Sequence, residues 1–428
     1  MRKIILGTLV SLAAMGASHA ANAEDLLKLY KYLHANPELS RVEFKTAALM
    51  ADKLDALGFD VTREVGETGV VAVMKNGNGP TVMIRADIDG LPVKEKTGLS
   101  YASTVMTKDY GGNEVPAMHA CGHDIHMTVL IGTAENLVAQ KENWSGTLIM
   151  ILQPAEELGQ GARLMIDDGL FTRFPRPDYN LALHDSASLE AGQIGLVSGY
   201  AMANVDSVDI TVRGIGGHGA YPHTTKDPVV LAAQIVTSLQ TIVSRETSPL
   251  ESAVVTVGSI HGGTKHNIIP GEVKLQLTIR SYTDEVREST LKSIERIALG
   301  LGLAYGLPED KLPIVKLKDE YTPALYNNPE LTARLTPIIG KAIGQDVLAL
   351  KPVMGGEDFS QFGRVEPKIP GLLFWVGAVN AKTMKKAKKK GVSLPSLHSA
   401  LFAPDPKPTI DNGVKAMTAS ALELLQNK

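Results

Sequence analysis

The sequence has one cysteine, Cys121, among 428 residues. One cysteine cannot form a disulfide within the chain, so an internal disulfide framework is excluded. The thiol is therefore buried and inert, paired with another molecule, or a metal ligand. It stands between His119 and His123 in the stretch "MHACGHDIH", and these neighbouring histidines keep the third alternative open.

The sequence also has few long hydrophobic runs, and its net charge is small. Beyond the N-terminal segment, no apolar run approaches the ~20 residues that a membrane-spanning helix needs. The formal charge is only −3, or −5 once Arg2 and Lys3 are removed. This balance argues against a nucleic-acid partner and against a general role on anionic surfaces. An apolar content of 44% with 21% charged residues is typical of a globular protein.

The N-terminus predicts export. Arg2 and Lys3 form a basic start, residues 4–17 are apolar, and "SHA" and "ANA" each fit the small-residue pattern of a cleavage site. We interpret residues 1–23 as a secretory signal peptide cut after Ala23, and we expect a periplasmic or secreted protein. The alternative is a first buried helix, which the acidic sequence from Glu24 onward disfavours.

The length that remains favours two domains. Short apolar runs such as "TVMIRA" and "GTLIMILQ" alternate with helical patterns such as "TVLIGTAENLVAQ". This alternation predicts an α/β domain whose mixed, largely parallel sheet carries helices on both faces. We assign this catalytic domain to residues 24–200 and 320–428, with a final helix from about Ile410.

A second domain is predicted at residues 201–319. Its strands alternate in period two, as in "SVDITVRG", and two amphipathic helices lie between them. The order β-α-β-β-α-β is that of a ferredoxin-like unit. We therefore expect an inserted α+β domain.

Residues that bind metals follow the apolar runs, where the strands of such a sheet end. Thiolate, imidazole and carboxylate together suit zinc or a related divalent ion. Taken singly, a cysteine is more often a small buried hydrophobe and a histidine a satisfied hydrogen-bonding group. The adjacent glutamates of "QPAEE" favour a metal site, because one can bind metal while its neighbour stays free as a base. The candidate ligands are Cys121, His123, Glu157, His184 and His398.

Eight motifs carry a resemblance to a known family. In chain order they are "RADIDGLP", "HACGHD", "QPAEE", "LALH", "GGHGAYPH", "HNIIP", "GGEDF" and "SLHS". Together they resemble the aminoacylase/carboxypeptidase class of two-metal hydrolases, and within it the hippurate hydrolase and auxin-conjugate amidohydrolase subfamily. That subfamily has a cysteine where relatives have a bridging aspartate.

The resemblance implies a role for each matching residue. The five candidate ligands would bind two divalent ions per subunit, Zn or Mn foremost, with Co and Ni also suited to the ligand set. Glu156 would act as general base and acid, taking a proton from the attacking water and giving it to the leaving nitrogen. Asp89 matches a carboxylate that orients a ligand histidine. Asp87 falls where other branches have a metal-binding histidine, and we leave it outside the ligand set.

The inserted domain would act as a lid and dimerisation domain. By the resemblance, His218 reaches into the active site of a partner subunit and donates to the oxyanion, so a homodimer or higher homo-oligomer is expected. Asn267 and Arg280 match positions that bind the free carboxylate of the substrate, although Arg280 read alone is also consistent with a sheet-surface charge. "GIGGHG", Gly214 to Gly219, does not predict a dinucleotide site, because no helix follows it directly.

The function that we predict is metal-dependent hydrolysis of the amide bond of an N-acyl amino acid, hippurate-like or N-acetyl. One alternative is a dipeptidase or exopeptidase of the same fold. Another is a non-catalytic periplasmic protein that binds a metal or solute. The cluster Lys385 to Lys390 is expected to be a solvated loop, the alternative being an attraction for anionic substrates or an anionic envelope surface.

Overall fold

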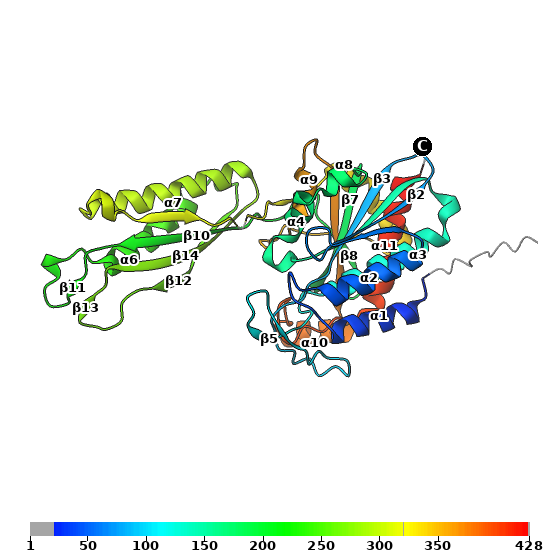
Figure 1. The fold of residues 1–428 in the computed structure, drawn as a ribbon, viewed down its shortest axis with the longest axis horizontal. Coiled ribbons are helices and arrows are strands. Elements are labelled where there is room, and N and C mark those ends of the chain that lie inside the picture. Colours follow the sequence, from blue (N-terminus) through cyan, green and yellow to red (C-terminus); the bar gives the residue numbers. More distant parts are fainter. Residues whose placement is uncertain (1–20, 320, 427–428) are drawn as a thin grey trace, which may run out of the picture.

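The computed structural model describes residues 21–319 and 321–426. Most of the predicted signal peptide, residues 1–20, therefore lies outside the described residues. Figure 1 shows a larger α/β body beside a smaller body made of one sheet and two long helices. No helix in the described part of the chain is long and apolar enough to cross a membrane.

An eight-stranded sheet forms the centre of the larger body. Four of its seven strand pairs are parallel, β6 with β3, β3 with β7, β7 with β18, and β8 with β17. The remaining pairs are antiparallel, so the predicted mixed, largely parallel sheet is confirmed. The strands, in spatial order, are β1 (Asp60–Arg63), β2 (Val70–Asn76), β6 (Gly146–Gln153), β3 (Thr81–Asp87), β7 (Tyr179–Glu190), β18 (Gly371–Val379), β8 (Ile194–Leu196) and β17 (Leu348–Ala349).

Helices cover both faces of this sheet, as predicted. Successive strand residues point to opposite faces, so Ile84 packs into one core cluster and Met83 into the other. The first face carries α1 (Ala23–Ala35), α2 (Phe44–Ala56), α3 (His123–Ala139), α8 (Pro329–Ile343) and α11 (Pro406–Leu425). The second carries α4 (Gly161–Asp167), α5 (Leu170–Arg173) and α9 (Ser360–Arg364).

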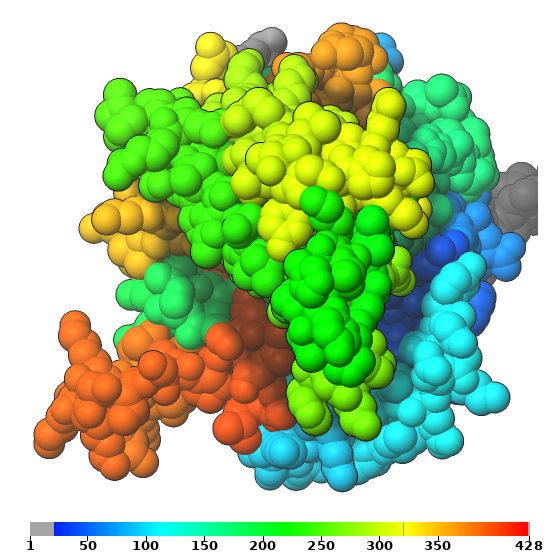
Figure 2. All heavy atoms as spheres, turned by 90° about the vertical axis from the view of Figure 1, so that its left-hand side faces the viewer, coloured from blue at the N-terminus to red at the C-terminus, as the bar shows by residue number. Residues whose placement is uncertain are grey.

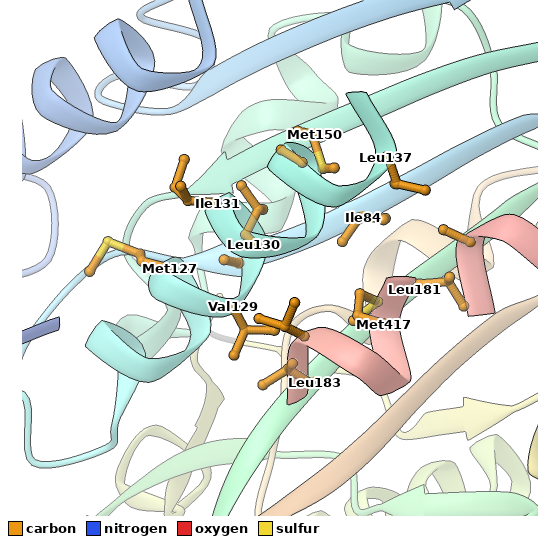
Figure 3. Packing of buried hydrophobic residues seen from close by; sticks show 14 of the residues in the cluster. Ile84, Met127, Val129, Leu130, Ile131, Leu137, Met150, Leu181, Leu183 and Met417 are labelled. Atoms are coloured by element: carbon orange, nitrogen blue, oxygen red, sulfur yellow. The ribbon is translucent and has the colours of Figure 1, made fainter. Parts of the chain in front are cut away.

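Helix α3 is central to the first face and is buried around almost its whole circumference. Such a helix is expected to lie inside a domain rather than on its surface. Figure 3 shows Val129 of α3 beside Leu183 of β7 and Met417 of α11. The N-terminus of α3, which carries His123, is thereby fixed at the edge of the sheet.

Two expectations near the C-terminus were wrong. The final helix begins at Pro406 rather than near Ile410, because proline is well suited to the first turn, where no backbone N–H is required. The Lys385 to Lys390 cluster is not a loop but most of helix α10 (Ala381–Lys390), which the Asn380 side chain caps and Gly391 ends in a left-handed conformation. Lysine and alanine favour helix, and lysines near a helix C-terminus interact favourably with its dipole.

The smaller body has the predicted β-α-β-β-α-β order. Its strands are β10 (Asp206–Arg213), β12 (Ala253–His261), β14 (Glu272–Ser281) and β15 (Ile314–Leu317). They pair antiparallel in the order β12-β14-β10-β15, and their buried residues share one core with α6 (Pro228–Thr241) and α7 (Asp284–Ala304). The ferredoxin-like fold is thus confirmed, whereas the boundaries at residues 201 and 319 stay a prediction.

Short elements complete the described chain. Three two-stranded pairings join β11 (Gly217–His218) to β13 (Ile268–Ile269), β9 (Gly199–Met202) to β16 (Leu325–Asn327), and β4 (Met106–Lys108) to β5 (Glu114–Pro116). A π-helical turn, Ile242–Glu246, extends α6. Four 3-10 turns are Lys141–Asn143, Glu156–Leu158, Pro222–Thr224 and Glu309–Lys311.

A buried histidine joins α1 to the start of α3. His34 lies 2.7 Å from Asp124 through Nδ1 and 3.1 Å from Glu95 through Nε2, and its side chain is fully buried. Burial lowers the pKa of His34, but the hydrogen bonds with Asp124 and Glu95 raise it by more, to about 10. His34 is therefore a cation at neutral pH, held between two carboxylates.

This arrangement makes stability depend on pH. Because the pKa of His34 is higher in the folded state than the ordinary 6.5, its contribution is complete below pH 6.5 and is lost as the pH rises through about 10. We expect His34→Gln to lower the free energy of unfolding by about 3 to 5 kcal/mol at pH 6, and by much less at pH 10. Denaturant unfolding at both pH values measures this, with the exposed His223→Gln as the control. A deficit that stays constant with pH would contradict the assignment.

Candidate active site

The site lies at the carboxyl edge of the central sheet. Strands β3, β6 and β7 are adjacent and parallel, so their carboxyl ends meet there. They bring together Asp87 and Asp89, the adjacent pair Glu156 and Glu157, and His184, which lies not at the end of β7, as predicted, but within it, two residues beyond its pairing with β3. This edge is where polar chemistry is expected in an open α/β sheet.

Tight backbone turns place the side chains that follow these strands. At Ala155 the chain adopts a left-handed conformation, with φ 48°, so that Glu156 and Glu157 turn away from the line of β6. Before α3, Gly122 has φ 79°, and a Cβ there would lie 2.4 Å from Asp185 Oδ1. Only glycine therefore fits between Cys121 and His123, which explains the spacing of the "HACGHD" motif.

The five predicted ligands lie in one cluster. Cys121 Sγ is 3.6 Å from His184 Nε2 and 3.3 Å from His398 Nε2. Glu157 bridges the cluster, with Oε2 3.4 Å from His398 Nε2 and Oε1 3.9 Å from His123 Nε2. Two triplets, Cys121 with His123 and His184, and Cys121 with Glu157 and His398, each keep their ligand atoms within 4.8 Å of one another.

Hydrogen bonds of His123 and His184 fix which of the two ring nitrogens, Nδ1 or Nε2, faces this cluster. His184 Nδ1 is 2.7 Å from the carbonyl oxygen of Asp185, and His123 Nδ1 is 2.7 Å from that of Asp89. A carbonyl oxygen can only accept, so both Nδ1 atoms donate, and in the neutral imidazole Nε2 keeps a free lone pair. In both side chains it is Nε2 that points to the cluster, as metal ligation requires.

The cluster fits divalent cations. His123 Nε2 and Glu157 Oε1 are buried and have no hydrogen-bond partner among the described residues, which is costly unless a ligand satisfies them. Burial, followed by the charge of Glu157, raises the pKa of the Cys121 thiol well above its usual range. A cation between these groups would favour the thiolate and satisfy the orphaned atoms together.

Asp89 has the position of a supporting carboxylate. Its Oδ2 accepts hydrogen bonds from Ser40 Oγ at 2.6 Å and from the backbone N–H of Glu157 at 3.1 Å. Its Oδ1 lies 3.2 Å from His123 Nδ1. Asp89 thus holds His123 and the backbone of Glu157 in fixed relative positions, both of them candidate ligands.

Glu156 borders the ligand cluster: with His123 and Glu157 it forms a further group whose ligand atoms lie within 4.8 Å of one another, and its role as a base outside the ligand set stays a prediction. Its Oε2 is 3.9 Å from His123 Nε2, and only 12% of its side chain is exposed. Burial first, then the charges of Glu357, Glu157 and Asp358, raise the pKa of Glu156 well above its usual range. A carboxyl group with a raised pKa can hold and release a proton near neutral pH, as a general acid and base must.

A buried network of hydrogen bonds and ion pairs beneath the site was not predicted from the sequence. The fully buried Arg85 donates to Asp87 Oδ2 at 2.8 Å, Glu357 Oε1 at 2.8 Å, Asp358 Oδ1 at 3.2 Å and Gln153 Oε1 at 2.8 Å. Burial opposes ionisation of Asp87, but Arg85, His123 and His126 together hold its pKa well below the usual range. An arginine inside the apolar strand "TVMIRA" was the available signal, because such a charge needs carboxylate partners.

Asp87 and two further histidines lie behind the ligands. Asp87 Oδ2 is 3.5 Å from His123 Nε2, yet its carboxylate is already bonded to Arg85 and His126. The ring of His126 accepts from the Asp185 backbone N–H at 2.9 Å through Nε2, so its Nδ1 donates to Asp87. His119 is buried with no side-chain partner among the described residues. Leaving Asp87 out of the ligand set stays a prediction.

A pocket of about 420 Å³ opens over the cluster, and Arg280 lines it together with Glu156 and His398. Arg280 lies on β14 of the smaller body; its Nε donates to Thr278 Oγ1 at 3.2 Å, and no carboxylate of the described chain forms an ion pair with it. Burial lowers the pKa of Arg280. An unpaired guanidinium in a partly buried position is suited to a carboxylate ligand.

His218 and Asn267 do not lie in this pocket. His218 is exposed on β11, and the backbone carbonyl of Asn267 accepts from Gly219 N–H at 2.8 Å beside it. Both are at the tip of the smaller body that is farthest from the central sheet (Figure 1). Figure 2 views the molecule from this end, with the smaller body in front. In this structure, therefore, neither residue lies at the ligand cluster of its own chain.

Comparison with known proteins agrees with this geometry. The model of peptidase family M20/M25/M40 matches residues 83–400. The chain belongs to this family. It is 37% identical to thermostable carboxypeptidase 2 of Saccharolobus solfataricus, over 89% of this chain and 90% of the relative. It is 38% identical to N-acetyldiaminopimelate deacetylase of Streptococcus sanguinis, over 82% of this chain and 90% of the relative.

A solved structure of the family has the same fold. The YXEP protein of Bacillus subtilis, described as a dinuclear metal-binding peptidase of the M20 family, superposes with a TM-score of 0.75 at 28% identity. The match covers 94% of this chain and 98% of that one. The resemblance to this class of hydrolases is thus confirmed, and the protein is a metal-dependent hydrolase of amide bonds. The alternative of a binding protein without catalysis does not agree with this family membership.

Proposed function

We propose that the protein hydrolyses the amide bond of N-acyl amino acids to a carboxylic acid and a free amino acid. The observation that carries this proposal is the content of one pocket: Glu156 lies beside the ligand cluster, and the unpaired Arg280 lines the same space. A proton-transfer group, a metal-binding cluster and a carboxylate-binding cation are the three elements that such a substrate requires.

Two divalent ions per subunit would be held by Cys121, His123, Glu157, His184 and His398. Support comes from the overlapping ligand triplets that share Cys121 and from the dinuclear relative. Bound there, the ions would polarise the scissile carbonyl and make water a better nucleophile at neutral pH. Zn and Mn suit the mixed thiolate, imidazole and carboxylate set, and Co or Ni would also fit.

The residues of the chain would then divide the reaction between them. Glu156 takes a proton from the attacking water as its oxygen bonds to the carbonyl carbon. The same carboxyl group gives that proton to the amide nitrogen as the C–N bond breaks, so one group serves as base and then as acid. Arg280 binds the carboxylate of the amino acid and thereby fixes the position of the scissile bond.

A second candidate is cleavage of a dipeptide or of the C-terminal residue of a peptide. The carboxypeptidase relatives favour it, and Arg280 would bind the C-terminal carboxylate of a peptide equally well. The two candidates differ at the other end of the substrate, because a dipeptide carries a free ammonium group there. A panel of N-acyl amino acids and dipeptides that share one C-terminal residue separates them by kcat/KM.

Two variants separate catalysis from metal binding. We expect Glu156→Gln to retain bound metal while turnover falls by several orders of magnitude, since glutamine cannot transfer the proton. We expect Cys121→Ser to lose metal affinity while it stays folded, because a hydroxyl is a poorer ligand than a thiolate. Elemental analysis and circular dichroism, with turnover of N-acyl amino acids, measure these effects. If Glu156→Gln hydrolyses these substrates at the parent rate, the mechanism is wrong.

We further propose that His218 acts in the active site of a partner subunit. It is exposed at the far tip of the smaller body and distant from its own cluster, so only another copy could receive it. Loss of such an oxyanion donor typically costs ~100- to 1000-fold in turnover.

Mixed dimers test this directly. His218→Ala and Glu156→Gln homodimers are expected to be nearly inactive. Co-expression of the two variants with different tags yields a mixed dimer with one intact site, Glu156 coming from one subunit and His218 from the other. We therefore expect this purified mixed dimer to recover about half of the parent turnover per dimer. A mixed dimer as inactive as its parents, or an active monomer, would contradict the proposal.

We also propose export to the periplasm or beyond. The side chain of Asn22 caps α1 by accepting from Glu24 N–H, and Ala21 N–H donates to Asn136 Oδ1 at 3.1 Å. Cleavage after Ala23 would remove this cap, which is worth about 1 kcal/mol, whereas cleavage after Ala20 keeps it. This cap favours the "SHA" site over the cut after Ala23 that the sequence predicts, and we therefore expect the exported protein to begin at Ala21. N-terminal sequencing after cell fractionation decides this, and a mature N-terminus at Glu24, or a cytoplasmic full-length chain, would contradict it.

A further inference from the structure

Helix α10 carries positive charge that the proposed function does not use. Six of its ten residues are lysine, and all six side chains are exposed. No carboxylate of the described chain forms an ion pair with any of them; among lysines and arginines, the ion pairs nearest along the chain are those of Arg364 and Lys407. The ammonium groups of α10 are therefore free to bind an anionic partner.

The lysines are concentrated on one side of α10. Successive residues of an α-helix are about 100° apart around its axis. Four of the lysines therefore fall within an arc of about 100°, on the side roughly opposite Ala387, the one buried residue of the helix. Because the chain itself caps both ends of α10, this surface is formed before any partner binds. The four residues, which we call the lysine face, are Lys382, Lys385, Lys386 and Lys389.

The rest of the chain has the opposite charge. Without the six lysines of α10, the sequence has 37 basic and 46 acidic residues, which gives a formal charge of −9 instead of −3. The small net charge argues against a general role on anionic surfaces, but it conceals this separation of charge. An anionic surface would attract α10 and repel most of the remaining molecule, so it would hold the protein in one orientation.

The position of α10 suits contact with an extended surface. Figure 1 shows the helix at the lower margin of the larger body, and in Figure 2 the deep-orange segment that includes it stands out at the lower left. Two further exposed lysines, Lys94 and Lys96, lie beside the chain that follows α10, because Lys96 N–H donates to the carbonyl oxygen of Ala400 at 2.8 Å. Neither forms an ion pair with a described carboxylate, the nearest such group in sequence, Glu95, being bonded to His34.

Exposed aliphatic side chains accompany this charge. Val392 follows the end of α10 and is 56% exposed, and Leu401, farther along the same segment, is 53% exposed. At the surface of an anionic bilayer, ammonium groups contact lipid phosphates while aliphatic side chains enter the boundary with the acyl chains. A soluble polyanion would use the lysines but not these aliphatic groups. The combination favours a bilayer as the partner.

We propose that the lysine face of α10, with Val392 beside it, binds the surface of a bilayer that contains anionic phospholipids. Each lysine near such a surface strengthens binding roughly fivefold, and a buried aliphatic side chain adds about tenfold. The surface lies outside the ligand cluster, so this inference does not depend on the reaction that the enzyme catalyses.

Sedimentation of the full protein with lipid vesicles tests the proposal. One set of vesicles contains phosphatidylglycerol and phosphatidylcholine in equal parts, and the other contains phosphatidylcholine alone. At about 0.1 M salt we expect at least ~100-fold tighter binding to the anionic vesicles. Salt at about 1 M should remove most of this difference, because it screens charges beyond ~3 Å.

Two fourfold variants compare the lysine face with lysines elsewhere. Replacing all four of its lysines by glutamine, which has a similar helix propensity, should weaken binding to the anionic vesicles by about 100-fold or more. The matched control makes the same change of charge at four exposed lysines that lie on other elements and form no ion pair with a described carboxylate. It should keep nearly the parent affinity. The control positions are Lys75, Lys141, Lys316 and Lys341.

A third variant separates a bilayer from a soluble polyanion. Val392→Ser keeps every lysine, and we expect it to weaken binding to the anionic vesicles about tenfold while binding of inorganic polyphosphate stays at the parent value. Circular dichroism of each variant checks that α10 and the rest of the chain remain folded.

Three outcomes would overturn the proposal. The first is equal binding to both kinds of vesicle, and the second is an equal loss of affinity in the lysine-face variant and its control. The third is binding of polyphosphate as tight as that of anionic vesicles, with Val392→Ser affecting neither. A salt-dependent fall in kcat/KM for a soluble N-acyl amino acid, with vesicle binding unchanged in the lysine-face variant, would show instead that the lysines attract substrate.

Discussion

The site depends on positive charge that neutralises the many carboxylates lying together at the carboxyl edge of the parallel strands. Asp87, Asp89, Glu156 and Glu157 follow two adjacent strands, and Glu357 and Asp358 approach the same edge from a later loop. Buried anions repel one another strongly at low dielectric. Arg85 offsets this repulsion from below, and the ligand cluster is built to hold positive charge from above. The carboxylates of the site thus lie between a fixed guanidinium on one side and a cluster suited to cations on the other.

The arrangement also explains how two adjacent glutamates acquire different tasks. Asp89 accepts from the backbone N–H of Glu157 and orients it toward His123 and His398. Glu156 remains under the influence of Glu357 and Asp358, which favour its protonated form. Glu156 and Glu157 are the same residue type and adjacent in sequence. Their roles differ because, after the turn at Ala155, their side chains contact different groups.

Much of this could be predicted from the sequence, but not all of it. The short apolar runs "TVMIRA" and "GTLIMILQ" were correctly predicted to be strands. The five candidate ligands were identified from the ordered family motifs. The order of strands β2-β6-β3 in the sheet could not be predicted from the sequence, because it depends on packing between segments that are distant along the chain. The Arg85 network was missed for the same reason: two of its carboxylate partners, Glu357 and Asp358, lie 272 and 273 residues away. The lysine-rich segment was misassigned because charge density outweighed helix propensity in our interpretation.

The position of the lone cysteine also has a consequence for how the chain folds and acquires its metal. Cys121 and His398 are 277 residues apart in sequence and 3.3 Å apart in space. An ion held by both would close a loop that spans the entire smaller body, and a link of that length restricts the unfolded chain strongly. The cation would then link two distant parts of the folded chain, as a disulfide does in other proteins. It would also be acquired late, since the last ligand is supplied only when nearly the whole chain has been made.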